Sequence, residues 1–76
     1  KPHPDIFLCA AHRLRRKPGE CLVVEDAEKG ILAAYAAGMK SVAVPNRYTR
    51  HHDFSRATAV ISSLHKLTAE FVESLA

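Results

Sequence analysis

The segment Cys21-Leu22-Val23-Val24-Glu25-Asp26 constrains this chain more than any other part of the sequence. Its first four residues form an unbroken apolar run, typical of a strand buried on both faces of a parallel sheet. Two carboxylates follow where this strand should end. Ligands bind at the carboxyl ends of strands in open α/β sheets, and carboxylate oxygens suit a hard cation such as Mg²⁺. The segment therefore predicts a metal site or, alternatively, acids that only favour the start of the next helix.

Helix patterns lie on both sides of this segment. A first helix is predicted from Pro4 to about Arg16, because apolar residues recur there on one face, namely Ile6, Phe7, Ala10, Ala11 and Leu14. A second helix is predicted after the acidic pair, with an apolar side made of Ile31, Ala34 and Tyr35. Gly38 is a suitable left-handed cap for that helix, and Thr68 is a suitable first cap for a last helix.

Two further strands are predicted at residues 41–44 and 59–61, and Ser62 or Ser63 is expected to begin a short helical turn. The polar stretch 46–58 between the strands is long for a connection. Strands separated by helices imply right-handed crossovers and a parallel sheet. The chain is therefore expected to adopt an α/β fold, a partial Rossmann-like parallel sheet of about three strands with flanking helices.

The composition fits one small globular domain, since 47% of the 76 residues are hydrophobic and 25% are charged. No apolar run approaches the roughly 20 residues of a membrane span, and no signal peptide is visible. Cys9 and Cys21 lack zinc-ligand or Cys-x-x-Cys spacing, which favours two buried, reduced thiols in a cytoplasmic protein. The net charge of +3 suits anionic substrates.

Three blocks of the sequence together resemble one known superfamily. They are Lys1-Pro2-x-Pro4-Asp5-Ile6-Phe7, Glu20-Cys21-Leu22-Val23-Val24-Glu25-Asp26 and Gly30-Ile31-x-Ala33-Ala34-x-Ala36-Ala37-Gly38-Met39. In this order and spacing they resemble the haloacid dehalogenase (HAD) superfamily, and most closely its phosphoglycolate phosphatase and β-phosphoglucomutase-like branch. The resemblance spans residues 1 to about 45, and the remainder fits the usual ending of the family loosely.

The resemblance implies roles for three side chains. It also implies a Mg²⁺ cofactor in the complete enzyme, and Mg²⁺ binding by this chain alone is expected to be weak or absent. Asp26 matches the fourth-motif acid that ligates Mg²⁺, and Glu25 matches the acid beside it, which supports the metal site directly or through water. Lys1 matches the catalytic third-motif lysine, which neutralises the phosphoryl group and the nucleophilic aspartate. The implied substrate of the complete enzyme is a phosphorylated small molecule. The alternative for Lys1 is a frayed terminal lysine without a role.

Two positions depart from the family pattern. Many relatives have Ser where Ala27 follows the acidic pair, so a hydroxyl cap for the next helix is missing. Relatives often end the first helix with Gly where Arg15 stands. Because an arginine in a left-handed cap would be strained, the sequence predicts that this helix runs on past Arg15.

The nucleophile of the family is missing from this sequence. The resemblance implies an N-terminal Asp-x-Asp motif, a Ser or Thr motif on the next strand and an inserted cap domain, and no Asp-x-Asp occurs in the sequence. Residues 1–76 are therefore expected to be the C-terminal part of a HAD-like core domain, a hydrolase fragment that is inactive alone. In the family topology the missing central strand lies beside Cys21–Val24. This strand edge is expected to mediate self-association into an oligomer, or binding of a companion fragment.

Two other functions stay open. The chain could be a free-standing, non-catalytic interaction or oligomerisation module derived from this fold. It could also bind nucleic acid through basic clusters at 13–17 and 47–56, although such clusters are more often solvated helix faces and loops. His51-His52-Asp53 could suggest a second metal site, but adjacent residues seldom converge on one ion, so a solvated loop is expected there.

Overall fold

The computed structural model describes residues 3–75, which form short helices and strands. A helix separates β1 from β2, but no helix separates β2 from β3. Along the chain the elements are α1 (Asp5–Arg13), the 3-10 turn η1 (Pro18–Glu20), β1 (Leu22–Glu25), α2 (Glu28–Ala36), β2 (Lys40–Ala43), β3 (Ala59–Val60), the 3-10 turn η2 (Leu64–Lys66) and α3 (Ala69–Ser74). The helices α1 and α2 have 9 residues each. Within residues 3–75, no helix has the length and apolar character that crossing a membrane requires.

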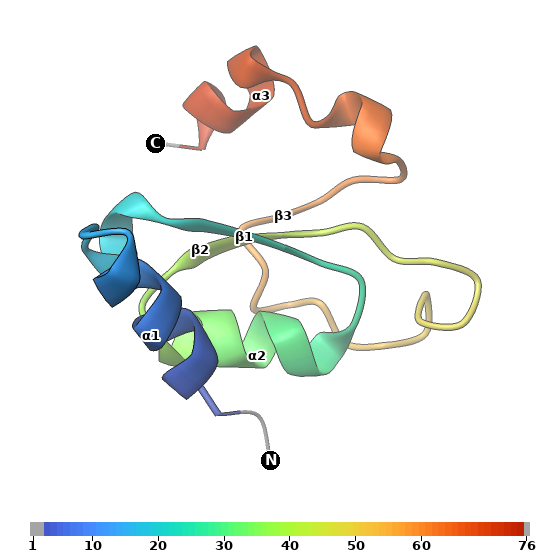
Figure 1. The fold of residues 1–76 in the computed structure, drawn as a ribbon. Helices are drawn as coiled ribbons and strands as arrows, with labels where there is room; N and C mark the ends of the chain where they lie inside the picture. Colours follow the sequence, from blue (N-terminus) through green and yellow to red (C-terminus); the bar gives the residue numbers. More distant parts are fainter. Residues whose placement is uncertain (1–2, 76) are drawn as a thin grey trace.

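The strands form one parallel sheet in the order β1-β2-β3. Leu22 is in register with Lys40, and Glu25 with Ala43. The ladder continues one step further, since the amide of Val44 donates to the carbonyl of Glu25 at 2.8 Å. The helices α1 and α2 lie on one side of the sheet, and η2 and α3 lie on the other (Figure 1). The predicted α/β fold with a three-stranded parallel sheet and flanking helices is thereby confirmed.

Most element boundaries lie within one residue of their predicted positions. The first strand begins at Leu22 rather than Cys21 and includes Glu25. Gly38 adopts the predicted left-handed conformation, with a φ of 76°. The predicted caps also form, because Ser63 and Thr68 accept hydrogen bonds from backbone amides at the starts of η2 and α3. Differences of one residue are ordinary at the ends of helices and strands.

The end of α1 differs from the prediction. The helix ends at Arg13, and Arg15 is left-handed with a φ of 56°. The amide of Arg15 donates to the carbonyl of His12 at 3.0 Å, and the next amide donates to the carbonyl of Ala11 at 2.9 Å. These two bonds make a Schellman cap, which satisfies carbonyl groups that the helix would otherwise leave unpaired. The predicted continuation past Arg15 is therefore wrong, because the cap forms despite the strained conformation.

The helix α2 and the strand β2 provide most of the core. The residues with no exposed surface are Ile31, Ala34, Val42 and Ala43. Tyr35, which the sequence placed on the apolar side of α2, is 55% exposed, so that prediction is wrong. Its position lies roughly 100° around the helix from Ala34, outside the narrow buried stripe. The guanidinium of Arg56 instead lies 4.6 Å from the centre of the Tyr35 ring, at cation–π distance.

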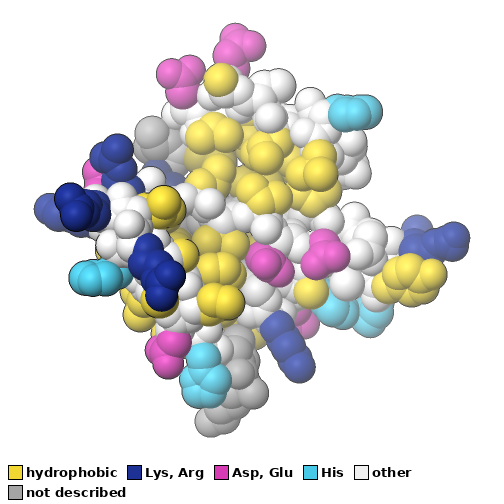
Figure 2. Space-filling model, viewed as in Figure 1, with side chains coloured by type: hydrophobic (Ala, Val, Ile, Leu, Met, Phe, Trp, Pro, Cys, Tyr) yellow, Lys and Arg dark blue, Asp and Glu magenta, His cyan; other side chains and the backbone are white. Residues whose placement is uncertain are grey.

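The edge of the sheet at β1 is less covered than predicted. Val23 is buried, but Val24 is 41% exposed, so β1 is not buried on both faces as predicted. The side chains of Ile6 in α1 and Leu14 at its C-cap are largely exposed, although the sequence placed both on the apolar face of the helix. Cys9 is also exposed, although it was predicted to be buried. A groove of about 220 Å³ runs between α1 and β1. Figure 2 shows apolar side chains gathered above and below β1 on this face.

Candidate metal site

The predicted acidic pair lies at the carboxyl end of β1. Glu25 is the last residue of the strand, Asp26 is the first beyond it, and Ala27 is the N-cap of α2. Because β2 is parallel to β1, the chain leaves both strands at the same edge of the sheet. The structure thus brings Asp26 and Glu25 together at the place where open α/β sheets bind ligands.

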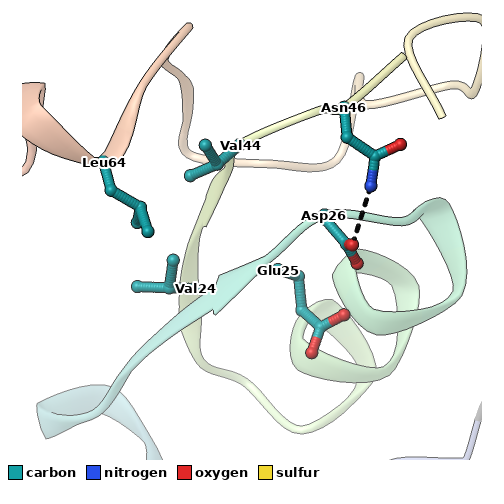
Figure 3. Close-up of a pocket in the computed structure, with 6 residues that line it drawn as sticks. All are labelled: Val24, Glu25, Asp26, Val44, Asn46 and Leu64. Carbon is teal, nitrogen blue, oxygen red and sulfur yellow. Dashed lines mark hydrogen bonds between the residues drawn. The ribbon is translucent and has the colours of Figure 1, made fainter. Parts of the chain in front are cut away.

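A pocket of about 340 Å³ opens at this edge and has one apolar and one polar wall (Figure 3). The apolar wall consists of Val24, Val44 and Leu64. The polar wall consists of Glu25, Asp26 and Asn46. The acidic pair therefore borders a shallow pocket that is open to solvent.

The carboxylate of Asp26 is held by Asn46, a residue that the sequence did not single out. The side-chain Nδ2 of Asn46 donates a hydrogen bond of 3.0 Å to Oδ2 of Asp26 (Figure 3). The two residues lie 20 positions apart, and the packing of β2 beside β1 brings them together. A local signal existed, since an asparagine directly after a strand and a proline is typical of a turn.

Asn46 is itself fixed by the loop that follows it. Its Oδ1 accepts hydrogen bonds from the amides of Tyr48 at 2.8 Å and Thr49 at 3.1 Å. The amide of Asn46 donates to Oγ1 of Thr49 at 3.0 Å. These bonds close the start of the polar stretch 46–58 into a tight turn of the Asx type. The polar stretch is therefore ordered where it borders the site.

The side chain of Glu25 folds over α2. A Cβ atom at Gly30 would overlap the Oε1, Cδ and Cγ atoms of Glu25, so the glycine leaves the space that this side chain occupies. Burial raises the pKa of Glu25 above its ordinary value, and the negative charge of Asp26 raises the pKa further. The two carboxylates therefore repel each other, and a cation bound between them would relieve that repulsion.

The start of α2 is capped from a distance. Ala27 makes no side-chain cap, as the missing hydroxyl predicts. His52 replaces it, because its Nδ1 accepts a hydrogen bond of 3.1 Å from the amide of Glu28. Oε1 of Glu28 in turn accepts a 3.1 Å bond from the amide of Asp53. The expected solvated loop is thus wrong for His52, which is half-buried and bound to α2.

The acidic pair fits Mg²⁺ as an open site. Within residues 3–75, no group of three or more His, Cys, Asp or Glu side chains is placed to hold a metal ion. Mg²⁺ is commonly bound through one or two carboxylates, with water and substrate phosphates as its other ligands. Asp26 and Glu25 suit that kind of site. Lys1, the predicted phosphate-binding lysine, lies outside the described residues.

Comparison with known proteins agrees with the fold. Residues 1–67 match the family described as HAD-hydrolase-like. The chain is 50% identical over 64 residues to a bifunctional riboflavin kinase/FMN phosphatase of Arabidopsis thaliana, covering 84% of this chain and 17% of that protein. It is 48% identical over 66 residues to a probable pseudouridine-5'-phosphatase of Drosophila melanogaster, covering 84% of this chain and 29% of that protein.

The solved structure of a β-phosphoglucomutase from Clostridium difficile superimposes with a TM-score of 0.84 at 37% identity, covering 99% of this chain and 32% of that one. The chain therefore spans about a third or less of the length of these relatives. The family match covers most of the chain, the relatives include a phosphomutase and phosphatases, and the fold is the same. This chain belongs to the HAD-like hydrolase family.

Proposed function

We propose that this chain supplies the metal-binding part of the active site of a Mg²⁺-dependent phosphatase or phosphomutase. The observation that carries the proposal is the position of Asp26. It follows β1 directly, lines the pocket at the carboxyl edge of the sheet and is held there by Asn46. In this role Asp26 ligates the cation, and Glu25 supports it directly or through water.

The other parts of the proposed site follow from phosphoryl-transfer chemistry. Bound Mg²⁺ would orient the phosphoryl group and screen its charge from an attacking carboxylate. Lys1 would neutralise the same phosphoryl group. The proposed substrate of the complete enzyme is a phosphorylated small molecule, in line with relatives named as an FMN phosphatase and a pseudouridine-5'-phosphatase. The two cysteines, both free thiols, support a reducing cytoplasmic location.

The nucleophile is proposed to come from a companion segment that pairs with the β1 edge. No Asp-x-Asp occurs in the sequence, so the chain is proposed to be a fragment of the enzyme that is inactive by itself. The exposed side of Val24 and the apolar groove between α1 and β1 support a strand docking there. The matched relatives have at least twice as many residues outside the match as within it, which is ample for such a segment.

Phosphate release from small phosphomonoesters tests this proposal. The isolated chain with Mg²⁺ is expected to release no phosphate above the uncatalysed rate. An enzyme in which the chain is joined to an Asp-x-Asp segment is expected to be active, and Asp26→Asn is expected to lower its kcat/KM by about 100-fold or more. Mg²⁺-dependent activity that survives Asp26→Asn would contradict the proposal.

Without a companion segment, the same edge is proposed to pair with a second copy of the chain. Sedimentation velocity of the isolated chain is then expected to show a dimer or larger oligomer. Val24→Lys should shift it toward monomer, since lysine protects exposed strand edges. A wild-type chain that stays monomeric at all concentrations would contradict pairing at this edge.

The open edge also supports a second function, a non-catalytic interaction or oligomerisation module. Self-association without any Mg²⁺ binding at Asp26 would favour that module over the enzyme. The basic residues support nucleic-acid binding less, because the Lys and Arg side chains in Figure 2 gather mainly at the left, with others apart at the lower centre and right, and form no continuous stripe. Binding to DNA or RNA that weakens steeply with salt would favour this third function.

A further inference from the structure

We propose that Asn46 is a positioning residue for the metal site, and that it presents one defined oxygen of Asp26 to the cation. This inference rests on the proposed function, since it assigns a role in the same site. In this role Asn46 touches neither the reacting atoms nor the metal. It acts through Asp26, to which its Nδ2 donates the bond of 3.0 Å.

The orientation of the Asn46 amide is determined by its surroundings. Its Oδ1 accepts two backbone N–H groups, from Tyr48 and Thr49. If the amide were turned over, its NH₂ group would face these two donors, and its oxygen would face the carboxylate of Asp26. Both contacts would then be repulsive. The NH₂ group must therefore point at Asp26, and Asn46 acts there as a donor.

The hydrogen bond divides the two oxygens of Asp26 between different tasks. Oδ2 accepts the bond from Asn46. Oδ1 has no bond of this kind in the described part of the chain, and it remains available as a ligand to a cation. Mg²⁺ demands near-ideal octahedral geometry and binds carboxylates with defined directions, so fixing the carboxylate plane favours binding.

Asp26 needs such support because its own surroundings restrain it little. Its side chain is exposed and follows the strand rather than lying within it. Hydrogen bonds to a ligating carboxylate orient the ligand, and losing such a partner typically lowers metal affinity about 10–100-fold. The turn from Asn46 to Thr49 provides a rigid donor on one side of the pocket. His52 and Asp53 then tie the following loop to the start of α2.

A titration with Mg²⁺ followed by ¹H–¹⁵N NMR tests the inference on the full chain. Shifts of the backbone amides at the end of β1 give the affinity, and shifts of the Asn46 side-chain NH₂ report on the bond itself. Asn46→Ser is the informative variant, because a hydroxyl can still accept from the turn amides but is too short to reach Asp26. Thr49→Val is the matched control, since it loses a bond of the same turn without touching Asp26.

Asn46→Ser is expected to weaken Mg²⁺ binding about 10-fold, and Thr49→Val to change it less than about two-fold. The wild-type NH₂ protons of Asn46 are expected to shift together with the amides at the end of β1. Thermal unfolding of each variant separates lost affinity from lost stability. Asn46→Ser with wild-type affinity, or Thr49→Val with an equal loss, would reduce Asn46 to a turn residue and overturn the inference.

The variant Asp26→Asn separates this inference from the proposed function. If Asp26→Asn abolishes the Mg²⁺ shifts but Asn46→Ser does not weaken them, only the role of Asn46 fails. If Asp26→Asn leaves the Mg²⁺ affinity unchanged, the metal site itself fails, and the role of Asn46 fails with it.

Discussion

Replacing Gly30 with alanine is expected to act on Glu25 rather than on α2 alone. The new Cβ atom would overlap the Oε1, Cδ and Cγ atoms of Glu25. Because Cγ is among these atoms, rotating only the carboxylate cannot relieve the overlap. The whole side chain must move to another rotamer or the helix must shift. Overpacking of this kind costs about 1–3 kcal/mol.

A second contribution opposes this cost. Alanine is more favourable than glycine within a helix by about 0.5–1 kcal/mol. In the wild-type background, Gly30→Ala is therefore expected to destabilise the fold by between about zero and 2.5 kcal/mol. When Glu25 is replaced by alanine, the three nearest atoms are gone. Gly30→Ala should then stabilise the fold by about 0.5–1 kcal/mol.

A double-mutant cycle measures the difference between these two backgrounds. Urea denaturation of the wild type, the two single variants and the double variant gives a coupling free energy, expected to be about 1–3 kcal/mol. The cycle isolates the contact from the helix propensity, which is the same in both backgrounds. Gly30→Ala that stabilises the fold equally with and without the Glu25 side chain would refute the reasoning.

Three further outcomes follow from the structure. Arg15→Gly should raise the free energy of unfolding, measured by urea denaturation, by about 1 kcal/mol, because glycine adopts the left-handed conformation without strain. A loss of stability would contradict the left-handed conformation assigned to Arg15. His52→Ala should lower the free energy of unfolding by about 1 kcal/mol, since the amide of Glu28 loses its acceptor. An unchanged urea midpoint would contradict this, because it would show that water replaces the bond at no cost. The raised pKa of Glu25 means that the native state binds its proton more tightly than the unfolded state, so its contribution to stability declines as the pH rises from 4.5 through the raised pKa. Glu25→Gln should therefore gain stability relative to wild type across that pH range, and the opposite trend in unfolding at several pH values would reverse the assigned sign.

The acidic pair could be predicted from sequence because its signal is local. An apolar run followed by two carboxylates predicts that Glu25 and Asp26 lie at the end of a strand, whichever strands it pairs with. The left-handed conformation of Gly38 was predictable for the same reason, since a glycine that caps a helix depends only on the residues of that helix. Both features depend only on residues that are close in the sequence, so the sequence pattern is enough to predict them.

The supporting residues could not be predicted in this way. Asn46 meets Asp26 from 20 residues away, and His52 meets the start of α2 from 24 residues away. Both contacts exist only after the strands have paired, and no residue spacing encodes them. Val24 was predicted to be buried because its segment is apolar, but burial also depends on what covers the edge of the sheet. The left-handed conformation of Arg15 likewise results from the hydrogen bonds of the helix cap, although arginine itself disfavours this conformation.

The position of a bound divalent ion tests the central claim most directly. Mn²⁺ broadens the NMR signals of nuclei near it, so its binding site on the chain can be mapped residue by residue. The structure predicts that broadening begins and is strongest at the carboxyl ends of β1 and β2, around Asp26 and Asn46, is weaker at α3, and disappears in Asp26→Asn. Broadening centred on His51 to Asp53, or unchanged by Asp26→Asn, would contradict the claim that the acidic pair forms the metal site.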